Sequence, residues 1–186
     1  MGIVKKIKSY VKSVLGIDHG PGVDDLVAMG MKVGKNFFPN TGAFFDNSHC
    51  WLIEIGDDVT FGPFVYILAH DASTKRELGY TKIGKVVIGD RAFIGARTIV
   101  MPNVKIGSDC IIGAGSVVTH DVPDGSVYAG NPARLICTVD EYYSKQKALM
   151  ENNPCYDYSY TIKGNISDEK KQQMIKELES NIGFVI

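Results

Sequence analysis

The sequence predicts a mainly β protein built as a parallel β-helix, because a six-residue hydrophobic repeat runs through its middle. Glycine follows the aliphatic residue in four of six consecutive blocks, and the fifth place is always small or β-branched. A step of six is a whole number of two-residue strand periods, whereas a helix of about 3.6 residues per turn would scatter these side chains. The aliphatic positions are Ile88, Ile94, Val100, Ile106, Ile112 and Val118.

Such short strands, joined by tight corners at a fixed spacing, form a solenoid with a continuous buried core. An earlier run keeps the same register from Ile55 to Ile67, and an outlying block, VGKNFF at Val33, opens the array. The small fifth residue fits a corner, where a large side chain would collide with neighbouring coils. We therefore assign the β-helical domain to residues 31–136.

The two flanks differ from the repeat. Residues 1–30 are predicted to form an N-terminal helical cap, because residues 3–15 alternate apolar and basic groups as an amphipathic helix does. Such a basic amphipathic segment also fits a membrane surface, and the sequence leaves both readings open.

Beyond Ile136 the repeat stops, and residues 137–186 are predicted to be a C-terminal helical extension. VDEYYSKQKALM has the composition of a helix docking on the last coil. Residues 167–180 read as a second helix, with Ser167 at its N-cap and acidic residues in its first turn.

Size and composition indicate one domain with short appendages. The chain has 186 residues, 45% of them hydrophobic, and a formal net charge of -1, which gives no overall attraction to nucleic acid. No apolar run reaches the length of about 20 residues that spans a membrane, and the N-terminal segment lacks the features of a secretion signal. The four cysteines form no CxxC pair, so a reduced, cytoplasmic setting is expected.

The most informative feature is an interruption of the repeat. Ile67 and Ile88 are 21 positions apart, which is not a multiple of six, so residues 70–85 are predicted to leave the solenoid as a loop. His70 stands at the root of this loop, and loops on rigid scaffolds often carry function. A histidine there is a candidate general base, and it is equally well a surface residue without a role.

Over residues 33–136 the chain resembles the hexapeptide-repeat acyltransferases, in particular galactoside, maltose and bacterial polysaccharide O-acetyltransferases. The segments that carry the resemblance are ILAHD, IGAGSVVTHDVPDGSVYAGNPARLI and FFDNSHCWLIEIGDDVTFGP. The resemblance implies a homotrimer of left-handed parallel β-helices, with active sites between subunits and acetyl-CoA as donor. It also implies that His70 is the general base in a direct transfer, which needs no nucleophilic serine or cysteine.

The same resemblance implies a donor groove. Ala96 matches the residue whose backbone N–H stabilises the oxyanion. The remaining matches to the CoA groove are Ala114, Thr119, His120 and Arg134, the last as a phosphate contact. Relatives often have lysine where this chain has His120, and tryptophan where it has Phe93.

On the acceptor side, Asp46 and Asn47 match positions that hydrogen-bond the acceptor in sugar-acetylating relatives. An Asx turn that closes an irregular coil accounts for the same two residues equally well. His49 and Trp51 follow, and structural roles are favoured for both. The expected acceptor is therefore a hydroxyl of a sugar or of a surface-polysaccharide precursor.

Other readings stay open at this point. The acceptor alternatives are the amine of an amino-sugar nucleotide and the hydroxyl of serine, and a non-catalytic β-helical scaffold is an alternative of another class. The related γ-type carbonic anhydrases bind zinc with histidines. The four histidines here, at positions 19, 49, 70 and 120, show no short ligand spacing, so no metal site and no metal requirement are predicted.

Overall fold

A computed structural model describes residues 21–186, so the predicted helix over residues 3–15 lies outside the described part. The chain forms two compact units, Met1–Val139 and Asp140–Ile186. The first described helix, α2 (Val23–Ala28), buries Leu26 beside the first coil of strands, where the Leu26 carbonyl lies 3.7 Å from Cys50 Sγ.

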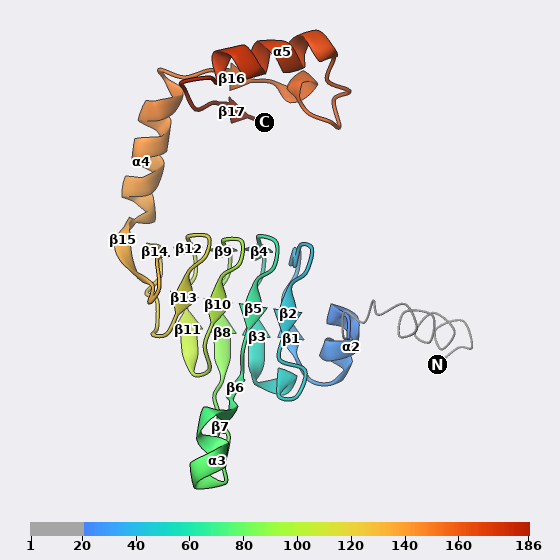
Figure 1. The fold of residues 1–186 in the computed structure, drawn as a ribbon, viewed down its shortest axis with the longest axis vertical. Coiled ribbons are helices and arrows are strands. Elements are labelled where there is room, and N and C mark those ends of the chain that lie inside the picture. The colour runs from blue at the N-terminus through green and yellow to red at the C-terminus, as the bar shows by residue number, and fades with distance from the viewer. Residues whose placement is uncertain (1–20) are drawn as a thin grey trace, which may run out of the picture. The chain divides into compact units, whose positions relative to one another are not determined.

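The first unit is a solenoid of short parallel strands that stack into three faces (Figure 1). Face A holds β1 (Lys32–Val33), β3 (Ile53–Ile55), β8 (Val86–Ile88) and β11 (Val104–Ile106). Face B holds β4 (Thr60–Phe61), β9 (Phe93–Ile94), β12 (Ile111–Ile112) and β14 (Ser126–Ala129). Face C holds β2 (Phe44–Phe45), β5 (Tyr66–Ile67), β10 (Ile99–Val100) and β13 (Val117–Val118).

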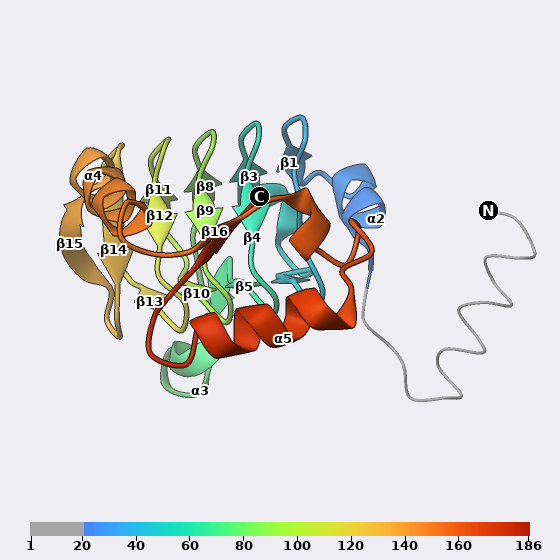
Figure 2. The same ribbon diagram turned by 90° about the horizontal axis from the view of Figure 1, so that it is seen from above.

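The chain visits faces A, B and C in turn, and every stacked pair within these faces is parallel. Figure 2 shows the successive coils as a row along the unit. One further strand, β15 (Arg134–Thr138), pairs antiparallel with β14 and ends face B. The mainly β, parallel-stacked fold predicted from the repeat is confirmed.

The repeat positions explain the core. The aliphatic residues that open the hexads are all buried, and so are the fifth-place residues from Ala92 to Val122. The backbone bends one residue earlier, at the fourth place, where Arg91, Arg97 and Asn103 adopt positive φ angles of 55°, 59° and 63°. The small fifth residue therefore points into the core just after the bend. Each buried Val or Ile contributes about 1.5–3 kcal/mol to folding.

The repeat is interrupted twice, both times between face C and face A. This step takes 6 positions in a regular coil, from Val100 to Ile106. It takes 10 positions from Phe45 to Ile55 and 21 from Ile67 to Ile88. Because the two longer steps belong to consecutive coils, their extra residues leave the solenoid at the same corner, one above the other.

The shorter interruption contains a 3-10 turn, η1 (Cys50–Leu52). The longer one is an excursion that projects from the solenoid (Figure 1). It is made of β6 (His70–Asp71), η2 (Ala72–Thr74), α3 (Lys75–Leu78) and β7 (Lys82–Ile83). β6 and β7 pair antiparallel, and Lys82 Nζ lies 2.7 Å from an Asp71 carboxylate oxygen.

The second unit carries the two helices expected from the sequence, α4 (Val139–Met150) and α5 (Asp168–Glu177), with the Ser167 hydroxyl capping α5. It also contains η3 (Tyr158–Tyr160) and the parallel strands β16 (Cys155–Tyr156) and β17 (Phe184–Val185). The docking of the first helix on the last coil stays a prediction. Within residues 21–186 no helix has the length and apolarity to cross a membrane.

Candidate active site

The candidate site lies at the corner where the two interruptions meet. Asp46 follows β2 directly, and its backbone N–H donates to the Ile67 carbonyl of the next coil at 2.9 Å. His70 opens the excursion three residues after Ile67. The stacking of the two coils therefore sets Asp46 beneath the root of the excursion.

Asp46 and His70 form a hydrogen-bonded pair. The Asp46 side chain is 1% exposed, and its Oδ2 accepts hydrogen bonds from His70 Nδ1 and, at 3.0 Å, from the Ala69 backbone N–H. Its Oδ1 accepts from the Ser48 N–H at 3.0 Å. With three hydrogen bonds holding its carboxylate in place, Asp46 fixes the orientation of the imidazole ring.

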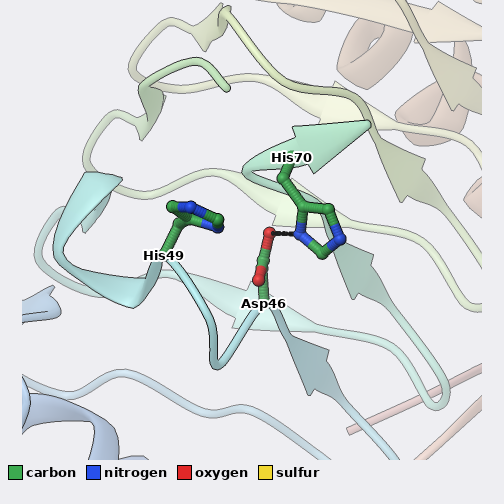
Figure 3. Close-up of side chains that lie close together, drawn as sticks. All are labelled: Asp46, His49 and His70. Carbon is green, nitrogen blue, oxygen red and sulfur yellow. Dashed lines mark hydrogen bonds and ion pairs between the residues drawn. The ribbon is translucent and has the colours of Figure 1, made fainter. Parts of the chain in front are cut away.

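This arrangement leaves one imidazole nitrogen free for chemistry. An ionised Asp46 accepts the proton on Nδ1, so a neutral His70 carries its lone pair on Nε2. The His70 side chain is 37% exposed, and its second nitrogen points away from Asp46 (Figure 3). The geometry is that of a base held by a buried carboxylate.

His49 is the third member of this cluster. Its ring centroid lies 5.4 Å from that of His70 and 5.5 Å from that of Trp51. Among the described residues, its Nδ1 is buried and has no hydrogen-bond partner. In Figure 3 the rings of His49 and His70 flank the Asp46 carboxylate.

The fold thus assembles three residues that the sequence spacing kept apart. One potential ligand atom from each of Asp46, His49 and His70 lies within 4.8 Å of the other two. Short spacing between histidines along the sequence is not needed for this cluster, because neighbouring coils bring distant residues together. The signal in the sequence was the pair of interruptions at the same step of the coil.

The two residues predicted for acceptor contacts take different positions. Asp46 closes the Asx turn through Ser48 and is covered by its partners, so it faces His70 rather than solvent. Asn47 is exposed, and its Oδ1 accepts from the Ser48 hydroxyl at 3.4 Å. Of the two, only Asn47 is exposed to solvent.

Two residues predicted for the donor groove are stacked in neighbouring coils. The Ala96 carbonyl accepts from the Gly115 N–H at 2.8 Å, directly after Ala114. A Cβ added at Gly95 would lie 2.5 Å from the Ala114 nitrogen, and one at Gly62 would lie 2.5 Å from the Ala96 nitrogen. This edge of the solenoid is therefore built of small residues whose backbones are in close contact.

The other three residues predicted for the donor groove, Thr119, His120 and Arg134, are all exposed. Thr119 Oγ1 lies 2.8 Å from His120 Nδ1. Arg134 is exposed, and its Nη1 donates to the Ala133 carbonyl at 2.9 Å. The Ala133 N–H in turn donates to Val117 of β13, which places the GNPAR segment along that strand.

Comparisons with known proteins agree with this fold. Residues 85–120 match the family described as bacterial transferase hexapeptide (six repeats). The chain is 40% identical over 121 residues to "Putative acetyltransferase YvoF" of Bacillus subtilis (strain 168). The matched segment covers 65% of this chain and 68% of the relative.

Two solved structures are also similar. A maltose O-acetyltransferase from Clostridium difficile 630 has 39% identity and a TM-score of 0.54, covering 59% of each chain. The hexapeptide-repeat acetyltransferase VCA0836 from Vibrio cholerae O1 biovar eltor, complexed with acetyl-CoA, has 28% identity and a TM-score of 0.53, covering 59% of this chain and 60% of the other. The present chain thus spans less than two thirds of either solved protein. It belongs to the hexapeptide-repeat transferases and is an acyltransferase by class.

Proposed function

We propose that this chain is an acetyl-CoA-dependent O-acetyltransferase that modifies a hydroxyl of a sugar or of a surface-polysaccharide precursor, with His70 as general base. The hydrogen bond between the buried Asp46 carboxylate and His70 Nδ1 carries this proposal. A carboxylate in this position fixes the tautomer and orientation in which Nε2 accepts a proton.

In the proposed reaction, His70 Nε2 takes the proton of the acceptor hydroxyl while the oxygen attacks the thioester carbonyl. The resulting tetrahedral oxyanion receives a hydrogen bond from the Ala96 N–H. Its collapse breaks the C–S bond, releases the acetyl ester, and returns the proton from His70 to the departing CoA thiolate. The Ala96 carbonyl accepts a hydrogen bond from the Gly115 N–H, whereas the Ala96 N–H itself donates no hydrogen bond within residues 21–186.

The donor arm is proposed to lie along Ala96 and Ala114, where small side chains let pantetheine approach the backbone. Thr119, His120 and Arg134 follow toward the phosphates of CoA, since a guanidinium suits phosphate recognition. The acetyl-CoA bound to VCA0836 supports the choice of donor. His120 contributes less charge here than a lysine would.

The acceptor is proposed to be sugar-like because a maltose O-acetyltransferase is among the similar proteins. Asn47 is the proposed acceptor contact, while Asp46 acts through His70. Between the Asp46–His70 pair and the donor residues, no hydrogen bond or ring contact occurs within residues 21–186. We therefore propose that a complete site forms between subunits of a homotrimer of left-handed β-helices. We also propose that the β-helical domain spans residues 31–136 and that the protein works in the cytoplasm.

An acceptor screen tests the function. Purified protein would be incubated with acetyl-CoA and, in separate reactions, with oligosaccharides, amino sugars and serine, and the released CoA thiol would be measured. The proposal predicts turnover with a sugar hydroxyl. Turnover confined to an amine or to serine would change the acceptor class. The absence of turnover, together with no CoA-dependent thermal shift, would indicate a non-catalytic scaffold. A mass of three chains by light scattering would support the trimer, and a monomer would contradict it.

A further inference from the structure

We propose that Asp46, His49 and His70 together bind a divalent transition metal ion, with Zn²⁺ the best-suited ion. Binding of this ion and proton abstraction by His70 exclude each other. In the metal-free state His70 would act as the base, and in the metal-bound state all three residues would be metal ligands. The binding itself does not depend on the proposed acetyl transfer.

The donor atoms fit zinc. Two imidazoles and one carboxylate are a common ligand set of Zn²⁺, with water completing the coordination. The three ligand atoms lie within 4.8 Å of one another. Because Zn²⁺ sits about 2.0–2.2 Å from nitrogen and oxygen ligands, binding requires His49 to move inward and the Asp46–His70 contact to open slightly.

His49 gives an independent reason for this assignment. Its Nδ1 is buried and unpartnered among the described residues, although buried polar atoms nearly always have a partner. The proposed catalysis uses neither nitrogen of this ring. A metal ion beside Asp46 would give His49 the partner that residues 21–186 do not supply.

Neighbouring groups would hold the carboxylate ligand in place. The Ser48 and Ala69 N–H groups both donate to Asp46 at 3.0 Å, and hydrogen bonds of this kind orient ligating carboxylates. Partial exposure of the His70 side chain gives an ion a route from solvent. Asp71, next in sequence, is already neutralised by Lys82 at 2.7 Å, so Asp46 is the carboxylate that remains for the ion.

A metal ion bound at this site would prevent His70 from acting as a general base. His70 faces Asp46 through Nδ1, and a metal bound there requires the single proton of the neutral ring to reside on Nε2. Nε2 would then be a donor and would have no lone pair for an acceptor hydroxyl. Zn²⁺ is therefore expected to inhibit without touching the donor groove.

Metal binding can be measured without any acceptor. Protein freed of metal by a chelator would be titrated with Zn²⁺ by calorimetry and with Co²⁺ by visible absorption. We expect one ion per chain and, for His49→Gln, an affinity weaker by at least about tenfold, since removal of groups that support a metal site costs 10–100-fold. Asp46→Asn should weaken binding similarly, whereas His120→Gln, a histidine outside the cluster, should bind as the unmodified protein does.

Thermal melts first establish that each variant is folded, so that a loss of metal binding can be assigned to the substituted side chain. No binding of either ion to the unmodified protein would overturn the proposal, as would Zn²⁺ binding that is lost in His120→Gln and kept in His49→Gln. If the acceptor screen yields turnover, Zn²⁺ should inhibit it in parallel with site occupancy. If the screen yields none, the binding data still test the metal site.

Discussion

The same Asp46 oxygen, Oδ2, accepts hydrogen bonds from the backbone N–H of Ala69 and from Nδ1 of His70. The first bond fixes the carboxylate to the coil from which the excursion leaves, and the second orients the imidazole. Main-chain stacking thereby sets the position of the proposed base. Asp46 is accordingly a positioning residue, and its effects should pass through His70.

Replacement of Asp46 by Asn should lower kcat by about 10²–10⁴, the range in which a positioned acid–base group contributes. The amide no longer fixes the tautomer with the proton on Nδ1, so Nε2 loses its lone pair in part of the population. The KM for acetyl-CoA should change little. Steady-state kinetics measure both constants, and the pH profile of kcat/KM should also move. Loss of activity only through a raised KM for acetyl-CoA would count against this role.

Replacement of Arg134 by Ala should raise the KM for acetyl-CoA by about tenfold or more, because hydrogen bonds to charged groups contribute about 1.5–3 kcal/mol. The maximal rate should fall much less, since the phosphates lie far from the reacting carbonyl. Arg76→Ala is the matched control, an exposed arginine of the excursion whose ion pair with Glu77 spans 3.9 Å. An equal rise in both variants would exclude a specific phosphate contact.

Replacement of Gly95 by Ala should destabilise the solenoid by about 1–3 kcal/mol, as overpacking typically does. The new Cβ would lie 2.5 Å from the Ala114 nitrogen and 2.6 Å from the Ile112 oxygen, both backbone atoms that cannot rotate away. Gly22→Ala is the control, since its nearest neighbour would be 3.8 Å away. Denaturant titration measures the two changes. Equal stability of both variants would mean that the space around Gly95 accommodates a Cβ without strain.

The cysteines should differ in reactivity. Burial raises the pKa of the Cys110 thiol, so this group stays protonated at a pH where an exposed thiol has begun to ionise. Cys155 is exposed and should react first with a thiol reagent at pH 8, whereas Cys110 should react only after unfolding. Cys155→Ser should remove the fast phase. Persistence of an equally fast phase in that variant would show that another thiol is accessible.

The sequence predicted the repeat and the strands well, because Ile88 and its successors alternate between core and surface on a fixed period. It also singled out His70, since the step from Ile67 to Ile88 breaks that period visibly. The partner of His70 was harder to predict. The step from Phe45 to Ile55 breaks the period too, but the block before it has little hexad character. The sequence alone therefore does not indicate that both breaks fall at one corner.

The role of Asp46 illustrates the same limit. In the sequence it reads either as an acceptor contact or as an Asx turn, and the structure adds a third function by stacking it under His70. The sequence favours a structural role for His49. Only the folded chain buries its Nδ1, which has no hydrogen-bond partner among the described residues. Contacts between coils depend on how many residues each corner takes, which residue types alone do not specify.

The most direct test of the proposed chemistry is turnover by His70→Ala with acetyl-CoA and the acceptor found in the screen. We predict a loss of at least about 10² in kcat, as expected for removal of a general base, with CoA binding by calorimetry unchanged because the donor groove is intact. Full turnover by the folded variant would contradict the assignment of His70 as the base.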